Sequence, residues 1–540
     1  MRRMDAALLA LLFAFALLLR VGVAVAYHFD GLYGQDPFAY YDFAAALAQG
    51  HAPAVFFWPL GYPALLAAGF WLFGISAATA QGISLLLGAL LSPLVYALAR
   101  HMDSGRVGAF VAGLLMAVCG QALQSSLVVM ADIPALAWTT VSALCLWRYK
   151  VLRHAGAKHA LPFLVLCALT LALACITRWL CLICIPLWGI IYLTAQPWKR
   201  DSFNSHLHNG LSGSPSPPPA GASLQLRFWR GAGFRVRSDA SKAEILREML
   251  LTLVFVLLVF LPQVLYSRSN PYPTLNHAWV QGWSPSNALA HEFTNLDGYF
   301  SYERINAIYY AQVYADPYYL APVWTPFVLL GLVLLLHKRQ WSKALFLGGW
   351  ALLPYLFLVG IPYQNIRFPL LAFPAVAVLA GIGFAALLEK AVQSPRKHIA
   401  YGGWACLVLC FGLLLTGHTN RLLVGEFLAN QQYDRQSVEW AAAQIPDGAR
   451  VYSLGLTLML RHYTDYEVYE LYNQTPATLS AQWQYGEDDY LLVSVWSLQN
   501  QWQGREPDIA VHWLLDHRGL VRLNSNQRYT LFRINGRNGN

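Results

Sequence analysis

Long apolar stretches recur along most of the chain, and short polar segments separate them. Each stretch holds roughly twenty residues, which is enough for a helix to cross a hydrocarbon core of about 30 Å. The pattern predicts about eleven membrane-spanning helices. We expect these spans at residues 6–27, 77–99, 107–125, 131–149, 160–177, 179–196, 246–266, 321–337, 343–361, 367–388 and 398–417.

One further apolar stretch, residues 58–74, is not expected to cross the membrane. Lys and Arg gather in the loops that the other spans place on one side, among them Arg100, Arg106 and the loop that begins at Lys199. Because basic loops stay on the cytoplasmic side, this bias places the N-terminus inside. A crossing at 58–74 would move Arg100 and Arg106 outside. We therefore interpret it as a re-entrant or interfacial helix pair within a first outer loop, residues 28–76.

The composition agrees with a polytopic membrane protein. Apolar residues make up 57% of the chain and charged residues 12%, whereas soluble proteins contain roughly a quarter charged residues. The net charge of +9 arises from basic residues that concentrate in the predicted inner loops, where anionic lipid headgroups attract them. The charge therefore predicts membrane lipids and no nucleic acid as partners. The sequence also has no P-loop, Rossmann glycine pattern or nucleophile elbow, which argues against nucleotide binding.

Three segments are expected outside the membrane. Residues 197–245 form an inner loop rich in Ser, Pro and Gly and are predicted to be disordered. Residues 267–320 form a large outer loop that is too aromatic for disorder, so we expect it to fold over the outer mouth of a transmembrane domain, residues 1–419. Residues 420–540 are predicted to form a small extracytoplasmic α/β domain. We expect a helix at 438–445 and strands of a mixed sheet at 450–454, 490–495 and 529–534.

Two acids are expected at the outer ends of spans. Asp36 follows the first span, lies among aromatic residues and precedes Pro37. Burial raises the pKa of a carboxyl group and improves it as a general base, although many acids at such positions are simply solvated. Asp132 begins the fourth span and reaches the same face. An acid at the start of a helix can also serve as an N-cap, and both roles stay open for Asp132.

Two arginines are predicted at the same face, where the positive-inside rule makes them rare. Arg178 lies between two spans, and Arg367 is at the start of another. The planar guanidinium fork suits a phosphate group, while the alternative is an arginine that only extends to the interface. No cofactor is predicted. The outer histidines His28, His51, His277 and His291 have no familiar ligand spacing, and a divalent metal held by carboxylates is left open.

Four motifs occur in a defined order. They are Asp36-Pro-Phe-Ala-Tyr40-Tyr-Asp42, Trp58-Pro-Leu-Gly-Tyr-Pro63, Asp132-Ile-Pro134, and a late segment from Arg367 to Pro374. With this order and a shared outer face, the chain resembles the GT-C glycosyltransferases over residues 1–420. It is most similar to the group of protein O-mannosyltransferases and lipid A aminoarabinose transferases, the glycosyltransferase family 39-like group.

The resemblance implies an inverting transfer of a sugar from a polyprenyl-phosphate donor to an acceptor. Asp36 matches the acid that activates the acceptor or orients substrates, and Asp132 matches the second acid. The predicted catalytic residues are therefore Asp36, as the general base, and Asp132, which assists it. Arg178 and Arg367 would bind the lipid phosphate. Asp42 and Tyr40 complete the candidate substrate-binding residues, with Asp42 mainly as structural support.

One position departs from the group, which often has a second acid directly after the first. Here Pro37 follows Asp36, and Asp42 is the nearest other acid in the motif.

The implied location is the outer face of a bacterial inner membrane, with a cytoplasmic N-terminus and an extracytoplasmic C-terminal domain. The acceptor would be a lipid-linked glycan, a surface polymer or a protein. A transporter or lipid flippase is one alternative, and a non-catalytic scaffold for envelope assembly is another. Transporters often place ionisable residues near the bilayer midplane in repeated halves, whereas the charges here are expected at span ends.

Overall fold

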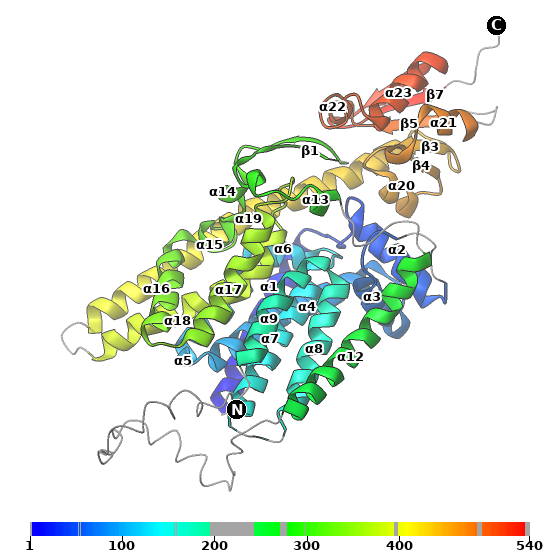
Figure 1. Cartoon of the computed structure of the whole chain (residues 1–540). Helices are drawn as coiled ribbons and strands as arrows, with labels where there is room; N and C mark the ends of the chain where they lie inside the picture. Colours follow the sequence, from blue (N-terminus) through cyan, green and yellow to red (C-terminus); the bar gives the residue numbers. More distant parts are fainter. Residues whose placement is uncertain are drawn as a thin grey trace, which may run out of the picture.

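The computed structural model describes residues 3–194 except positions 52, 54, 55, 156 and 158, and then residues 242–269, 278–295, 297–393, 398–482 and 489–534. The described part is a helical bundle with a small sheet region near the C-terminus (Figure 1). Most of the inner loop predicted at 197–245, as well as His277, lies outside the described residues.

The helices of the bundle follow the apolar pattern closely. Those before the long inner loop are α1 (Arg3–Ala26), α2 (Asp36–Ala48), α3 (Gly61–Phe73), α4 (Ala77–His101), α5 (Gly105–Val118), α6 (Gly120–Leu127), α7 (Asp132–His154), α8 (Leu161–Thr177), η1 (Trp179–Ile183) and α9 (Cys184–Thr194). Those after it are α12 (Lys242–Ser269), η4 (Pro322–Trp324), α16 (Thr325–His337), α17 (Trp341–Leu358), η5 (Phe368–Ala372), α18 (Phe373–Gln393) and α19 (His398–Ala442).

The predicted polytopic fold is confirmed, but the count of eleven spans is not. Among the described residues, six helices are long and apolar enough to cross a membrane, or seven if the bent pair α5–α6 counts as one span. The other predicted spans correspond to α7, which is less apolar, and to the shorter segments η1–α9, η4–α16 and α8. The thirteen-residue α3 is about 20 Å long, too short for a core of about 30 Å, in agreement with a re-entrant or interfacial helix.

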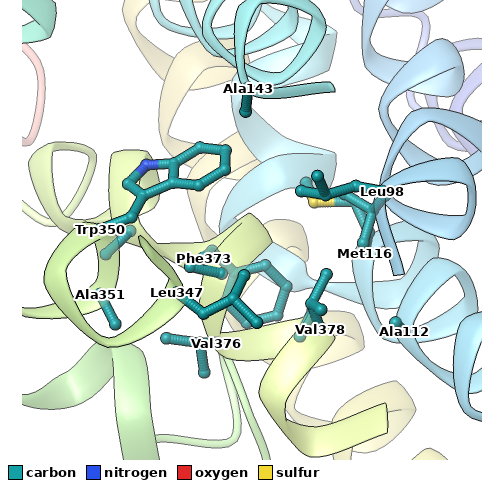
Figure 2. Packing of buried hydrophobic residues seen from close by; sticks show 14 of the residues in the cluster. Leu98, Ala112, Met116, Ala143, Leu347, Trp350, Ala351, Phe373, Val376 and Val378 are labelled. Atoms are coloured by element: carbon teal, nitrogen blue, oxygen red, sulfur yellow. The ribbon is translucent and has the colours of Figure 1, made fainter. Parts of the chain in front are cut away.

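The largest apolar core lies where α4, α5, α7, α17 and α18 meet (Figure 2). The side chains labelled there are Leu98, Ala112, Met116, Ala143, Leu347, Trp350, Ala351, Phe373, Val376 and Val378. The rings of Phe346 and Trp350 of α17 pack against each other and against Trp188 of α9. Trp350 Nε1 also donates a hydrogen bond to the Leu371 carbonyl of η5 at 2.9 Å, which connects the core to the segment that follows Arg367.

The span formed by α5 and α6 is bent by 51° at Cys119. Within a bilayer, carbonyl groups released by such a bend must find partners in the protein. Arg20 Nη1 of α1 donates a hydrogen bond to the Ala117 carbonyl at 3.2 Å, and Asn420 Nδ2 of α19 donates to the Val118 carbonyl at 2.7 Å. Polar side chains from two neighbouring helices therefore provide hydrogen bonds for the carbonyl groups at the bend. The chain continues from the bend toward α7.

Basic residues that we predict on the inner side meet at the end of the bundle that holds the N-terminus. Asp5 of α1 pairs with Arg100 and Arg106 at 3.4 and 3.1 Å. Lys343, at the start of α17, pairs with Asp103 in the turn between α4 and α5. Loops distant in sequence thus share one face, as the charge pattern predicts. We call the opposite end the site end.

The last helix differs from the prediction. α19 runs without interruption over 45 residues, so residue 420, where we expect the C-terminal domain to begin, lies inside it. The helix predicted at 438–445 is therefore not separate: residues 438–442 are helical, but as the last part of α19. Figure 1 shows α19 rising from the bundle to the sheet region.

The sheet region is mixed, as predicted. Its strands are β3 (Arg450–Ser453), β4 (Glu467–Glu470), β5 (Asp489–Val493), β6 (Leu520–Ser525) and β7 (Thr530–Ile534), in the order β4-β3-β5-β7-β6. β3 pairs in parallel with β4 and β5, whereas β7 is antiparallel to β5 and β6. The connecting helices are α20 (Thr457–Tyr463), η6 (Leu471–Asn473), α21 (Pro476–Gln482), α22 (Val495–Gln499) and α23 (Glu506–His517).

The loop between α12 and α16 is also ordered over its described part. It contains α13 (Ala278–Gln281), η3 (Pro285–Leu289), β1 (Glu292–Asn295), β2 (Gly298–Ser301), α14 (Asn306–Tyr310) and α15 (Gln312–Ala315). The β1–β2 hairpin contacts the sheet region: Arg505 Nη1 donates a hydrogen bond to the Asn295 carbonyl, and the Tyr299 amide donates to the Gln501 carbonyl at 3.1 Å. The hairpin is therefore tied to the sheet region at the site end.

Two close helix crossings on α18 depend on glycine. A Cβ on Gly381 would lie 2.2 Å from the Gly108 carbonyl oxygen of α5, and one on Gly383 would lie 2.1 Å from the Phe327 carbonyl oxygen of α16. Small residues at a membrane-helix interface let backbones approach closely. The two glycines thus hold α18 against two neighbours.

We expect Gly381→Val to destabilise the protein by about 2 kcal/mol or more, because the helix backbones must separate. Gly402→Val on α19 is the matched control, since a Cβ there meets no atom within 4 Å. The measurement is the thermal unfolding midpoint of both variants in detergent. Equal midpoints for both variants would contradict the assignment.

Candidate active site

Asp36 is the first residue of α2, and Pro37 occupies the first turn, where its fixed backbone angle suits a helix start. Its carboxylate lies at the site end with 32% of the side chain exposed. Asp36 Oδ2 is 4.0 Å from Arg367 Nη2. The first loop therefore brings an accessible acid beside one of the two predicted arginines.

Asp132 is more deeply buried and contacts both arginines. It is the first residue of α7, so the capping position falls on Ala131 and the N-cap role proposed from sequence is not observed. Asp132 Oδ2 accepts a hydrogen bond from Arg178 Nη1 at 3.0 Å and lies 3.8 Å from Arg367 Nη1. With only 4% of its side chain exposed, Asp132 has its charge balanced inside the protein.

Arg178 is held by a break between two helices. α8 ends at Thr177, and Arg178 adopts an extended backbone before η1 begins. Its guanidinium carbon lies 5.1 Å from the centre of the Phe368 ring, a cation–π arrangement. Gly61 of α3 approaches this break so closely that a Cβ would lie 2.7 Å from the Ile176 carbonyl oxygen. The Trp58–Pro63 segment thus supports the backbone that positions Arg178.

Arg367 lies directly before η5 and is oriented by Asn365. The Asn365 side-chain oxygen accepts hydrogen bonds from the Arg367 backbone N at 3.0 Å and from Nε at 3.3 Å. This leaves both terminal nitrogens for Asp36 and Asp132. Arg367 Nη1 has no hydrogen-bond partner among the described residues. The guanidinium therefore lies between the two acids with donor capacity remaining.

The charges at the site balance one another, two arginines against two acids. Burial raises the pKa of Asp36 above its ordinary value, while Arg367 and then Arg178 oppose the increase. Both arginines line a small pocket with a cavity volume of about 20 Å³, room for roughly one water molecule. Its lining residues are Asp132, Ala135, Leu136, Arg178, Leu180, Cys181, Arg367, Phe368, Leu370 and Leu371. The two guanidinium groups can donate hydrogen bonds to an anion such as a phosphate at this pocket.

The other two predicted residues lie in different surroundings. Tyr40 is buried, and its ring packs against Trp58 and Tyr62. Burial raises the pKa of Asp42, and the charges that oppose this are those of His462 and Arg461 of α20, not the two site arginines. The structure thus brings together Asp36, Asp132, Arg178 and Arg367, and it places Asp42 against the sheet region. The roles of all six residues stay predictions.

Sequence reasoning missed the residues that surround Asp36. The negative charge of Asp297, in the turn between β1 and β2, adds to the effects that raise the pKa of Asp36. Asp297 accepts a hydrogen bond from the Tyr472 hydroxyl at 3.1 Å. Gln35 Nε2 donates to Glu470 Oε2 at 3.1 Å. These contacts join segments far apart in the chain, and no sequence motif signals them. Asn365, which orients Arg367, was also missed; the available signal was an Asn two residues before an arginine, because Asn often bonds to the backbone two residues on.

A divalent metal receives little support from the donor set. No group of three or more His, Cys, Asp or Glu side chains suited to a metal occurs in the ranges that the structure describes. Asp36 and Asp132 already face guanidinium groups, and a divalent cation held between them would be repelled by those positive charges.

Comparisons with known proteins agree with this architecture. Residues 59–206 match the family model described as dolichyl-phosphate-mannose-protein mannosyltransferase. The fold is similar to the crystal structure of ArnT from Cupriavidus metallidurans bound to undecaprenyl phosphate, with 14% identity, a TM-score of 0.56, and coverage of 96% of this chain and 97% of that chain.

The fold is also similar to the archaeal oligosaccharyltransferase AglB from Archaeoglobus fulgidus in complex with an inhibitory peptide and a dolichol-phosphate. Here the identity is 14% and the TM-score 0.56, with coverage of 98% of this chain and 74% of that chain. No curated protein matches the sequence.

The chain is therefore a multi-pass membrane protein with the GT-C fold. Within that fold class, the sequence match over residues 59–206 fits the protein O-mannosyltransferase-like group that the motifs resemble. This confirms the predicted resemblance and the predicted fold class.

An ion pair with α19 holds the loop that precedes Asp36, and its contribution can be tested. Asp30 Oδ2 contacts Arg435 Nη1 at 3.1 Å and accepts a hydrogen bond from the Tyr463 hydroxyl at 2.8 Å. We expect Arg435→Ala to increase hydrogen exchange of residues 28–36 several-fold, because an anchor of the loop before Asp36 is lost. Arg522→Ala, an exposed arginine on β6, is the control. Unchanged exchange in Arg435→Ala would show that the pair does not hold the loop.

Proposed function

We propose that the chain is an inverting glycosyltransferase that moves a sugar from a polyprenyl-phosphate donor to a hydroxyl or amide of an acceptor. The observation that carries the proposal is the placement of Arg178 and Arg367 beside Asp132 and Asp36 at an apolar pocket. The GT-C fold supports it, since the matched structures were solved with undecaprenyl phosphate and with dolichol-phosphate.

In the proposed reaction, the acceptor atom attacks the anomeric carbon of the sugar from the face opposite the phosphate. The new bond from acceptor to sugar forms as the bond from sugar to phosphate oxygen breaks, which inverts the configuration. Asp36 takes the acceptor proton, and the electron pair of the broken bond leaves with the lipid phosphate.

Arg178 and Arg367 would stabilise the charge that develops on the departing phosphate. Both guanidinium groups are pre-positioned, by the Phe368 ring and by Asn365. Asp132 contacts both arginines and so helps to hold them in one orientation. We assign Asp132 a positioning role and Asp36 the role of base.

The proposed location is a bacterial inner membrane, with the site end on the outer face. The basic loops at the opposite end support this orientation through the positive-inside rule. The proposed acceptor classes are a lipid-linked glycan, a surface polymer and a protein. The exposed part of the Asp36 side chain, beside the β1–β2 hairpin and the sheet region, leaves the acceptor side open to any of the three.

We expect Asp36→Asn to lower turnover by about 100- to 10,000-fold, because the amide cannot accept the acceptor proton. The assay measures polyprenyl phosphate released from labelled undecaprenyl-phosphate sugars by the purified full chain, with a membrane extract as acceptor source. Asp447→Asn, at an exposed turn before β3, is the control. Full turnover in a folded Asp36→Asn variant would make the base assignment wrong. Passage of intact donor across vesicles without phosphate release would favour a flippase instead.

We expect Arg367→Gln to move the acid limb of the pH–rate profile to higher pH. A base must be deprotonated, so the rate falls as pH drops through the pKa of Asp36. Arg367 lowers this pKa, so its removal raises the pKa of Asp36 further. As pH decreases, the rate therefore begins to fall at a higher pH than in the wild type. The profile of kcat/KM for the donor is measured, because it reports ionisation of the free enzyme, and Arg367→Lys is the control that retains the charge. An acid limb at the wild-type pH in Arg367→Gln would contradict the coupling.

A further inference from the structure

A second pocket lies on the bundle, separate from the site pocket. It runs between α1, the bent span α5–α6 and the long helix α19, and we call it the α1–α19 groove. Its lining residues are Phe15, Leu19, Val23, Tyr27, Leu114, Val118, Leu123, Leu413, Gly417, Asn420, Arg421, Val424 and Gly425. It shares no lining residue with the pocket at Arg178 and Arg367.

The length of the α1–α19 groove matches one leaflet of a bilayer. Along α1 the lining extends from Phe15 to Tyr27, and along α19 from Leu413 to Gly425. At about 1.5 Å per residue, each wall is about 18 Å long. Half of a hydrocarbon core of about 30 Å is about 15 Å. The groove thus extends from near the bilayer midplane to the interface at the site end.

The two ends of the groove differ in chemistry. The end near the midplane has only apolar side chains, among them Phe15 and Leu413. The interfacial end has Tyr27, Asn420 and Arg421. Arg421 is exposed and makes no ion pair with an acid in the part of the chain that the structure describes. An unneutralised guanidinium at the end of an apolar slot is complementary to a phosphate that carries a hydrocarbon chain.

The other two polar residues at this end have different roles. The Asn420 side chain is used within the protein: Nδ2 donates to the Val118 carbonyl at 2.7 Å, and Oδ1 is buried beside Gly120, where an added Cβ would lie 2.0 Å from it. The Tyr27 hydroxyl lies over Gly425, where an added Cβ would be 3.0 Å from it. A charged group and a hydroxyl at one end of an apolar slot are typical of a binding site.

We propose that the α1–α19 groove binds an anionic phospholipid, with one acyl chain along α1 and α19 and the phosphate against Arg421 and Tyr27. The one-leaflet length favours an acyl chain over a polyprenyl chain, which is several times longer than the groove. The bound lipid would fill the space between the helix that leads to the first loop and the helix that carries the sheet region. The proposal does not depend on the transfer reaction.

Two substitutions test the two parts of the groove separately. Arg421→Gln removes the charge and keeps the apolar slot. Gly417→Leu places a side chain in the slot, because a Cβ at Gly417 meets no atom within 4 Å and therefore points into open space. The matched controls are Arg268→Gln, an exposed arginine in the last turn of α12, and Gly403→Leu, a glycine of α19 outside the groove whose Cβ also meets nothing.

The measurement is native mass spectrometry of the purified full chain with added dioleoyl phosphatidylglycerol or dioleoyl phosphatidylcholine. We expect the wild type and both controls to retain phosphatidylglycerol at least five-fold more than phosphatidylcholine. Arg421→Gln should lose this preference, and Gly417→Leu should lose both lipids. Equal retention of the two lipids by the wild type, or an unchanged preference in Arg421→Gln, would overturn the proposal. Displacement of phosphatidylglycerol by equimolar undecaprenyl phosphate would assign the groove to the polyprenyl lipid instead.

Discussion

The buried charge of Asp132 is the constraint on which the site depends. An uncompensated carboxylate in a low-dielectric interior is strongly unfavourable, and removal of one partner from a buried pair typically costs about 3–5 kcal/mol. Arg178 and Arg367 supply the compensation, and each must reach Asp132 from a different part of the chain. The break after α8 and the turn before η5 are therefore fixed relative to the start of α7. Among the described residues Asp36 forms an ion pair with Arg367 alone, and it is the accessible member of the group.

The membrane imposes a second constraint, on the backbone. Helix ends and bends near a bilayer core need hydrogen-bond partners from within the protein. The bend between α5 and α6 receives them from Arg20 and Asn420. The four charged site residues all lie at helix starts or breaks, where the chain changes direction. The irregular segments that a membrane domain tolerates at its boundary are thus the same segments that carry its candidate chemistry.

Much of this could be predicted from the chain because its signals are local. Apolar run length predicted most helices to within a few residues, and the loop charges predicted which loops share an end. Charged residues at span ends pointed to Asp36, Asp132, Arg178 and Arg367. The continuity of α19 was not predictable, because the apolar signal stops near residue 417 while the helix continues on polar residues with good helix propensity. The neighbours of Asp36, such as Glu470 and Asp297, come from tertiary packing and have no local signature.

The unbroken α19 has a mechanical consequence. A helix of 45 residues is about 68 Å long, roughly twice the hydrocarbon thickness, so it acts as a stiff lever with its pivot inside the bilayer. A change in local membrane thickness that tilts the buried half by a few degrees would displace the far end by several ångströms. Through Arg435 and Tyr463, that displacement reaches the loop that carries Asp36. A tilt of α19 within the bilayer would in this way be transmitted to the loop before the candidate base.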